Sequence, residues 1–308
     1  MKAPLQAAGQ TLTEIGEVAF VHRLTRQLAL DDDVRVGAGD DCAVIGKPRA
    51  ARWQLLKTDA VIEGIHFLAE EDPRRVGWKA LCRALSDIAA MGGVPAHALI
   101  TLAAPSTTPL ARIDGLYAGL RKAARRFGAS IVGGETSRSP GPLFLNVALT
   151  GWVERTRCVL RSGGRPGDAL YVTGRLGGSL AGKHLDFTPR LAEARWLVAH
   201  HRPRAMMDLS DGLAADLPRL ALASGCGYEI FRDRLPLTPG CTPEHGLAHG
   251  EDYELLFAIG ARAAGPLERA WKRHFPRLPL TRIGALRPAS KTRDSKKLPH
   301  GYDHFAQR

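Results

Sequence analysis

The sequence is poor in the residues that mark several classes of protein. Aromatic residues make up only 6% of its 308 residues, and the five cysteines are scattered, with no CxxC pair. Such cysteines argue against a disulfide framework or a zinc site and are typical of a reducing compartment. No apolar run approaches the roughly 18 residues that span a bilayer, and residues 1–10 lack the apolar core of a secretory signal. We therefore expect a soluble, cytoplasmic protein without a membrane span.

Negative charge is also scarce, because 43 Lys and Arg residues face 31 Asp and Glu residues, a formal net charge of +12. An excess of this size suits nucleic acid, an acidic small molecule, or simply a solvated basic surface. The basic residues are scattered and are not interleaved with aromatic residues, as a platform for single-stranded nucleic acid requires. The composition, 44% hydrophobic and 24% charged, is that of a globular protein. The scattered arrangement of the basic residues argues against a nucleic-acid partner.

The hydrophobic pattern predicts two domains. In the first half, strands are expected at 42–45, 53–56, 98–104, 130–132 and 143–153, with helices at 74–91 and 110–127. Consecutive strands are expected to pair as a meander, so we predict a mixed α/β domain over 1–154. The second domain, 155–308, is expected to hold strands at 169–173, 255–259 and 281–286 and helices after Gly212 and at 266–275.

Carboxylates gather next to the early strands. Asp40 and Asp41 follow a glycine-rich turn, and Asp59 comes just after the predicted strand 53–56. Open α/β folds place their ligands at strand ends. In so basic a chain, a carboxylate cluster there favours divalent metals that bridge to a phosphate ligand, because hard cations prefer oxygen ligands. The alternative is that these residues cap turns, as Asp often does.

Two later segments carry aspartates in positions of the same kind. Asp87 lies near the end of the helix 74–91, where a carboxylate opposes the helix dipole and is suited to a cation. Its helical neighbours Ala84 and Met91 are apolar, which argues against a solvated surface residue. Asp208 and Asp211 stand around a turn before a helix. They suit either a metal–phosphate site or a helix cap.

One glycine-rich segment nearly matches a nucleotide-binding motif. Residues 177–184, GGSLAGKH, approach the P-loop pattern G-x-x-x-x-G-K-[ST] after a predicted strand. His184 stands where a Ser or Thr hydroxyl must reach magnesium, so the motif lacks its metal ligand. We do not predict a P-loop here.

Eight motifs, taken together and in order, resemble one known family. They are AGDDCAV, KTDAVIEGIHF, LSDIAAMGG, VGGET, RSGGRPGD, DLSDG, HGEDYEL and GYDHF, and they extend over essentially the whole chain. The sequence resembles the thiamine-monophosphate kinases, which belong to the superfamily of aminoimidazole ribonucleotide synthetase. The resemblance implies an α/β N-terminal domain and an α+β C-terminal domain, with ATP between them. It also implies a homodimer in which the N-terminal sheets of two subunits form a barrel.

The activity implied is the ATP-dependent phosphorylation of thiamine monophosphate to thiamine diphosphate, assisted by several Mg²⁺ ions. The acceptor phosphate is already ionised and needs no general base, so positioning and charge neutralisation must supply most of the catalysis. By position, the implied magnesium ligands are Asp41, Thr58, Asp59, Asp87, Glu135, Asp208 and Asp211. The implied ATP contacts are Gly134, Glu135, Arg161 (as a phosphate clamp) and Ser210, and the implied substrate contacts are His66, Glu251 and Tyr302, the last stacking on the thiamine ring.

The chain departs from the family pattern at three places. Glu135 replaces a usual Asp, and its extra methylene changes the reach to a metal that tolerates little distortion. Lys57 stands where a hydroxyl residue is common, and its ammonium group predicts one fewer bound Mg²⁺ ion. The segment between Gly182 and His184 is shorter than usual.

Two other interpretations remain open. One is a sister ATP-using enzyme of the superfamily. Residues 1–20 lack the Cys of a selenophosphate synthetase, and the chain ends in Gln307-Arg308 without the C-terminal Cys of the hydrogenase-maturation relative. Aminoimidazole ribonucleotide synthetase fits GEDYEL and GYDHF poorly. The other interpretation is a basic scaffold that has lost turnover, which Lys57 and Glu135 keep open.

Overall fold

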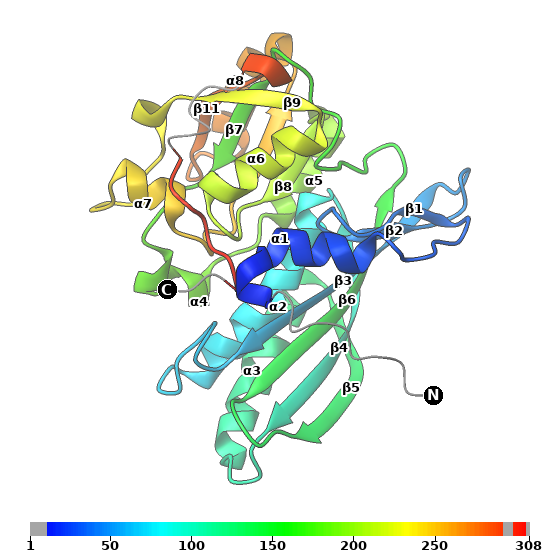
Figure 1. Cartoon of the computed structure of the whole chain (residues 1–308), viewed down its shortest axis with the longest axis vertical. Helices are drawn as coiled ribbons and strands as arrows, with labels where there is room; N and C mark the ends of the chain where they lie inside the picture. Colours follow the sequence, from blue (N-terminus) through cyan, green and yellow to red (C-terminus); the bar gives the residue numbers. More distant parts are fainter. Residues whose placement is uncertain (1–10, 292–297, 306–308) are drawn as a thin grey trace.

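The computed structural model describes residues 11–291 and 298–305. The N-terminal ten residues, where we predicted no secretory signal, lie outside these ranges. Figure 1 shows two sheets arranged along the long axis of the molecule, with the helix α1 and the C-terminal segment beside the region where they meet. The first half contains α1 (Leu12–Thr25), β1 (Val34–Val36), β2 (Ala43–Ile45), β3 (Arg52–Ile62), α2 (Pro73–Ala90), β4 (Val94–Ala104), α3 (Leu110–Phe127), β5 (Ser130–Arg138) and β6 (Phe144–Glu154).

The first sheet has six strands in the order β1-β2-β3-β6-β4-β5. The predicted meander is therefore wrong beyond β3, because β3 pairs with β6 rather than with β4. The strands β4 and β5 are parallel, and α3 supplies the crossover that a parallel pair requires. The helices α2 and α3 pack along one face of this sheet (Figure 1). Mixed α/β architecture is confirmed.

Two strands, β3 and β5, continue well past the ends that the sequence pattern predicted. The strand β3 continues to Ile62 because it pairs with β6 along its whole length. Lys57, Thr58 and Asp59 therefore lie within the strand and not after its end. In the same way β5 runs through Gly134, which pairs with Ile100 of β4. A Cβ atom on Gly134 would lie 1.8 Å from the carbonyl oxygen of Ile100, so this glycine allows close approach of the two strands.

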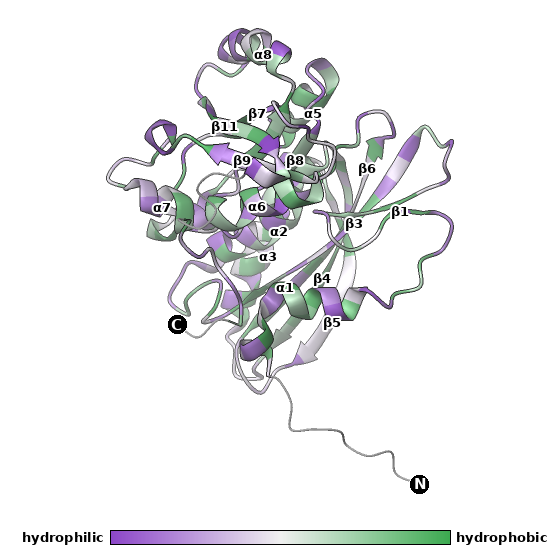
Figure 2. Cartoon of the chain, turned by 45° about the horizontal axis from the view of Figure 1, so that its top comes forward, coloured by the Kyte–Doolittle hydropathy of each residue, from purple (hydrophilic) through white to green (hydrophobic). Residues whose placement is uncertain are grey.

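The second half contains an antiparallel sheet of five strands in the order β8-β10-β7-β11-β9. Its strands are β7 (Ala169–Thr173), β8 (Ala205–Asp208), β9 (Cys226–Ile230), β10 (Leu255–Ile259) and β11 (Leu280–Pro288). Its main helices are α4 (Lys183–Asp186), α5 (Leu191–His200), α6 (Leu213–Ala223), α7 (Pro243–Ala248) and α8 (Ala261–His274). The outer helix α8 carries both hydrophilic and hydrophobic residues (Figure 2), as expected for a helix with one face on the core.

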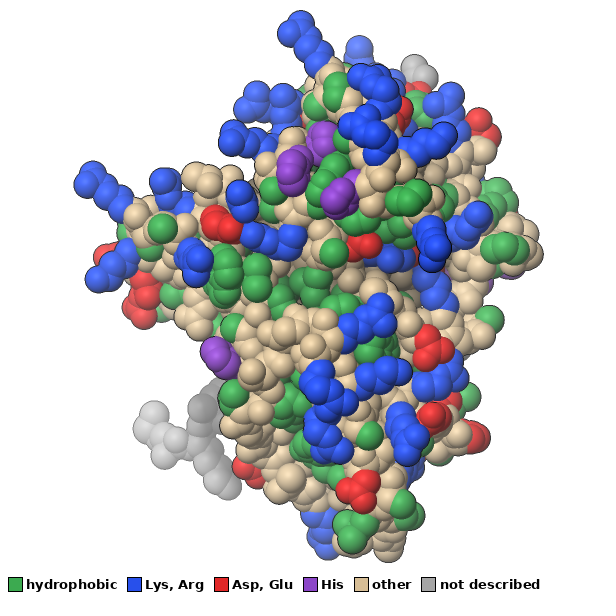
Figure 3. Space-filling model, turned by 180° about the vertical axis from the view of Figure 1, so that it is seen from behind, with side chains coloured by type: hydrophobic (Ala, Val, Ile, Leu, Met, Phe, Trp, Pro, Cys, Tyr) green, Lys and Arg blue, Asp and Glu red, His purple; other side chains and the backbone are tan. Residues whose placement is uncertain are grey.

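The two halves share a hydrophobic core. One continuous cluster of buried side chains includes Leu81 of α2, Tyr171 of β7 and Leu255 of β10. The division into domains 1–154 and 155–308 stays a prediction, although each sheet lies on one side of it. Within the described ranges, no helix has both the length and the apolar character that a bilayer crossing demands. Lys and Arg side chains are spread over the face shown in Figure 3 rather than gathered in one stripe.

Candidate active site

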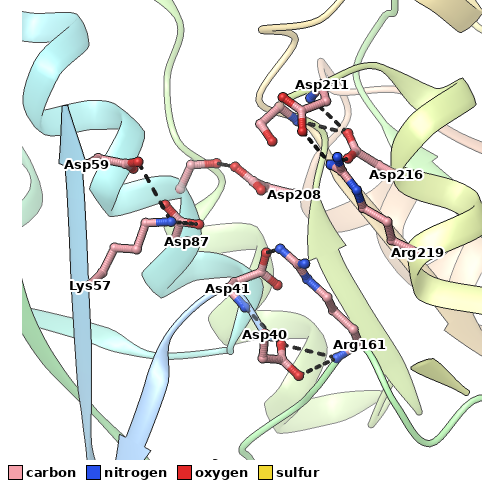
Figure 4. Close-up of polar contacts among 12 residues, drawn as sticks. Asp40, Asp41, Lys57, Asp59, Asp87, Arg161, Asp208, Asp211, Asp216 and Arg219 are labelled. Carbon is pink, nitrogen blue, oxygen red and sulfur yellow. Dashed lines mark hydrogen bonds and ion pairs between the residues drawn. The ribbon is translucent and has the colours of Figure 1, made fainter. Parts of the chain in front are cut away.

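Three aspartates from separate elements meet at one point (Figure 4). Asp41 lies just before β2, Asp87 in the last turn of α2, and Asp208 at the end of β8. One carboxylate oxygen from each lies within 4.8 Å of the other two. All three residues are buried, with at most 6% of their surface exposed. The structure thus brings together carboxylates that are up to 167 positions apart in the chain (208 − 41).

Burial makes the carboxylates of Asp87 and Asp208 hard to ionise without a cation. Burial, followed by the charge of Asp41, raises the pKa of Asp208 to about 7, and burial raises the pKa of Asp87 well above its ordinary value. The Oδ2 atom of Asp41 is buried and has no hydrogen-bond partner. Buried polar atoms normally have partners, and oxygen-rich clusters are the sites that Mg²⁺ prefers. The residues present therefore fit a divalent magnesium ion.

Lys57 and Asp59 extend this cluster from β3. Two residues apart on a strand, they point to the same face of the sheet. The Nζ atom of Lys57 lies 2.8 Å from Oδ1 of Asp87 and 3.8 Å from Oδ1 of Asp59. Burial raises the pKa of Asp59, but the charges of Lys57 and Arg83 outweigh this effect and the pKa is lowered. The ammonium group of Lys57 thus already supplies positive charge between two predicted metal ligands.

Thr58 is not brought to this cluster. Successive side chains of a strand point to opposite faces of the sheet, so Thr58 lies on the face opposite to Lys57 and Asp59. Its side chain is exposed, and its hydroxyl donates a hydrogen bond to Oδ1 of Asn146 at 3.0 Å. The single chain does not bring the Thr58 side chain to the other predicted metal ligands, because β3 continues through this residue. Its role as a metal ligand stays a prediction.

Arg161 connects the cluster to the loop that follows the first sheet. Its Nη2 atom lies 2.6 Å from Oδ1 of Asp41, and its backbone N–H donates to the carboxylate of Asp40 at 3.1 Å. Burial, followed by the charge of Asp41, raises the pKa of Asp40 to about 7. The Nε atom of Arg161 is buried without a partner. This guanidinium group can therefore accept a further anion, as a phosphate clamp requires.

Ser210 and Asp211 lie on the loop between β8 and α6, and both line the same cavity as Asp87 and Asp208. The backbone N–H groups of both residues donate to Oδ2 of Asp216, at 3.1 and 3.0 Å. Asp211 forms an ion pair with Arg219, as Figure 4 shows. Because Arg219 already neutralises the Asp211 carboxylate, a metal ion bound there would have to share this carboxylate with Arg219.

The cavity has a volume of about 290 Å³. Besides Asp59, Asp87 and Asp208, it is lined by the three residues predicted to contact the substrate, which are His66, Glu251 and Tyr302. Tyr302 is held there by its backbone N–H, which donates to the carbonyl oxygen of Asp211 at 3.0 Å. The C-terminal segment also packs on α1, where the rings of Phe20 and Phe305 meet with centroids 5.7 Å apart.

Glu251 is anchored by a buried lysine. The Nζ atom of Lys79 on α2 lies 2.8 Å from Oε2 of Glu251, and Nδ1 of His184 lies 3.2 Å from the same atom. Burial raises the pKa of Glu251, but His184 and Lys79 outweigh this effect and lower it to about 2. Glu251 also has a left-handed backbone, with φ at 62°. Non-glycine residues in this conformation are strained, and they cluster at functional sites.

His66 faces the same cavity as a neutral ring. Burial, followed by the charge of Arg83, lowers its pKa to about 3. Its Nδ1 atom accepts a hydrogen bond from the backbone N–H of Ile62 at 3.1 Å, which leaves Nε2 as the protonated nitrogen. The carbonyl oxygen of His66 accepts from Nζ of Lys79 at 2.5 Å. Lys79 therefore ties both predicted substrate residues to α2.

Gly134 and Glu135 are not part of this cavity. They lie on β5, at the edge of the first sheet, and both are exposed. The site also contains residues that the sequence pattern did not single out for this role: Lys79, Arg83 and His184. A basic residue in an amphipathic helix ordinarily indicates its solvated face, so Lys79 and Arg83 carried no signal. His184 was considered only as a defect in a P-loop.

Comparisons with known proteins agree with this architecture. Residues 39–153 match the family of AIR synthase related proteins, N-terminal domain. The chain is similar to the thiamine-monophosphate kinase of Rhodopirellula baltica, with 36% identity over 93% of this chain and 96% of that protein. It is 35% identical to the thiamine-monophosphate kinase of Aquifex aeolicus, over 96% of this chain and 99% of that protein.

Solved structures give the same result. The fold superposes on AaThiL complexed with AMPPCP and TMP with a TM-score of 0.83, at 32% identity, over 97% of this chain and 100% of that one. The HypE–HypF complex, at 18% identity and a TM-score of 0.71 over 89% of this chain and 95% of that one, shares the fold alone. Fold and site together define an enzyme of the AIR synthase related class. Within that class, the chain belongs to the thiamine-monophosphate kinase family.

Proposed function

We propose that this protein transfers the γ-phosphoryl group of ATP directly and in line to thiamine monophosphate, forming thiamine diphosphate. The observation that carries the proposal is the meeting of Asp41, Asp87 and Asp208 beside a cavity lined by His66 and Glu251. Relatives that cover nearly the whole chain are named for this activity. A structural neighbour is complexed with AMPPCP and TMP, an ATP analogue and the proposed acceptor.

The acidic residues are proposed to hold several Mg²⁺ ions, with Asp41, Asp59, Asp87 and Asp208 as the main ligands and Asp211 as a further one. When bound, these ions would neutralise the charge of the two phosphate groups that must approach each other. Arg161 is proposed to clamp the ATP phosphates from the opposite side. Ser210 is proposed to contact the nucleotide next to it. No residue has to act as a general base, because the acceptor oxygen already carries negative charge.

On the acceptor side, the side chains are arranged for orientation. Glu251 is ionised over the whole neutral range because its pKa is about 2, so it suits the positively charged ring system of thiamine. The neutral ring of His66 offers a hydrogen-bond donor at Nε2. Tyr302 can stack on the substrate ring. The hydrogen bonds of Lys79 keep His66 and Glu251 at a fixed separation.

A homodimer is also proposed. The face of the first sheet that α2 and α3 leave uncovered exposes Leu99, at 49%, and Val132, at 58%, and apolar surface of this kind marks interfaces. Thr58 lies on the same face, and Gly134 and Glu135 lie on its edge strand. The roles of Thr58, Gly134 and Glu135 as ligand contacts remain proposals, and they depend on a second subunit that completes this face. Sedimentation analysis should give twice the mass of the 308-residue chain, and a monomer would contradict this.

The function is tested by incubating the purified protein with ATP and Mg²⁺, with and without thiamine monophosphate. Thiamine diphosphate formed only when thiamine monophosphate is present supports the proposal. ATP consumption with a different acceptor would indicate a sister enzyme of the superfamily. Bound ATP without turnover on any acceptor would indicate a non-catalytic scaffold.

A further inference from the structure

Arg83 is a partly buried cation at the border between the acidic cluster and the acceptor side of the cavity. It lies on α2 one turn before Asp87, so the two side chains share a helix face. Its Nη2 atom is 3.9 Å from Oδ1 of Asp59. The side chain retains 14% of its exposure and lines the cavity. Arg83 thus lies beside the place where donor and acceptor must meet.

The guanidinium group of Arg83 lacks the partners that a structural arginine has. Its Nε and Nη1 atoms are buried without a hydrogen-bond partner, and its ion pair at 3.9 Å is too long for a hydrogen bond. Arg190, by contrast, donates two hydrogen bonds of 2.6 Å to Glu254. Leaving a buried charged donor unpaired is unfavourable. A group held in this state is suited to an anion that arrives with a ligand.

The position of Arg83 distinguishes between the two phosphate-bearing ligands. Arg161 lies on the far side of the acidic cluster, where it contacts Asp41 at 2.6 Å. Arg83 lies instead on the side of His66, whose pKa its charge lowers. Lys57 contacts Asp87 and Asp59 from β3, so Asp59 has a fixed cation on each side. Two resident positive charges therefore face the acceptor half of the cavity.

We infer that Arg83, supported by Lys57, binds the phosphate group of the acceptor without a metal ion. The inference rests on the proposed function, because it takes a phosphate monoester of a cationic ring compound as the ligand. The planar guanidinium group is matched to phosphate geometry, and the ammonium group of Lys57 adds a second fixed positive charge. Binding of the acceptor therefore does not require the loading of magnesium.

The experiment measures the affinity of the full-length protein for thiamine monophosphate and for thiamine by calorimetry, in EDTA and without nucleotide. Wild type should prefer thiamine monophosphate. The Arg83→Gln variant should lose about tenfold to a hundredfold in affinity for it, as expected for hydrogen bonds to a charged group, and keep its affinity for thiamine. Arg83→Lys should recover part of the loss. Arg121→Gln, an exposed arginine of α3, should behave as wild type.

Folding is checked by thermal melting of the ligand-free variants. Because Nε and Nη1 of Arg83 have no hydrogen-bond partner in the free protein and its ion pair with Asp59 is long, Arg83→Gln and Arg83→Met should melt no lower than wild type. A large drop in both would indicate a structural arginine and would overturn the inference. The inference would also be overturned if Arg83→Gln still preferred thiamine monophosphate over thiamine. A wild-type protein that shows no such preference in EDTA would overturn it as well. The same preparations are also assayed with Mg²⁺ and ATP. Formation of thiamine diphosphate by wild type would support the proposed function even if the inference about Arg83 fails.

Discussion

The Nζ atom of Lys57 lies 2.8 Å from Oδ1 of Asp87, in the middle of the group of carboxylates predicted to bind magnesium. Burial lowers the pKa of Lys57, but the charges of Asp87 and Asp59 outweigh this effect and raise it. The lysine is therefore charged at any pH at which the enzyme works. A protein cation therefore lies between two of the proposed magnesium ligands, Asp59 and Asp87.

We expect Lys57→Thr to increase the requirement for magnesium. Without the ammonium group, Asp59 and Asp87 lose their shared counter-charge, and a divalent ion must replace it. Activity should then need a higher Mg²⁺ concentration, and a nucleotide-bound crystal should contain one more ion than wild type. Lys47→Thr, in an exposed turn, serves as the control. A full set of metal ions beside an intact Lys57 would refute this prediction.

Asp59→Asn is expected to abolish turnover without unfolding the chain. Asparagine has nearly the same shape but lacks the charge that a metal ligand supplies, so the loss should be at least about a hundredfold in kcat. Lys57 retains its contact with Asp87, so the melting temperature should change little. The measurement is steady-state kinetics with circular dichroism, and Asp114→Asn is an exposed control. A near-normal rate would remove Asp59 from the site.

Removing one member of the pair formed by Lys79 and Glu251 should destabilise the fold. Lys79 is fully buried, so Glu251→Gln leaves a buried ammonium without its counter-charge, at a cost of about 3 kcal/mol. Lys79→Met should also raise the KM for thiamine monophosphate, because His66 and Glu251 lose their common anchor. The double variant should lose less than the sum of the single losses in urea unfolding. If the losses of unfolding free energy in the single variants were strictly additive, the contact between Lys79 and Glu251 would contribute nothing. Lys272→Met, at an exposed position, is the control.

The protein should lose stability in acid over two pH ranges. The pKa of His66 falls from 6.5 to about 3 in the folded state, so below pH 6.5 protons bind mainly to the unfolded chain and stability decreases. The pKa of Glu251 falls from 4.5 to about 2, so its contribution of about 3 kcal/mol is present above pH 4.5 and is lost toward pH 2. Unfolding free energies measured against pH should show a smaller decrease below 4.5 in Glu251→Gln. An unchanged slope would contradict the assignment.

Much of the fold could be predicted because the apolar pattern is strong where strands and helices are buried. Residues 169–173 and 255–259 are strands at the predicted bounds, since each is a largely apolar segment that is buried in full. The pattern failed at β3 and β5, where polar residues continue the strand. There the ends depend on hydrogen bonds to β6 and β4, which are partners far away in the chain.

The sequence by itself determined the family, the kinds of elements and the acidic residues, because these depend on local patterns and on motifs in a particular order. Only the tertiary structure decided which side chains share a cavity. It placed Asp41, Asp87 and Asp208 within 4.8 Å of one another, turned Thr58 away from them, and put Lys79 and Arg83 under the site rather than in solvent. The physical reason is that the direction of a side chain depends on strand pairing and helix packing, which involve contacts between distant parts of the chain.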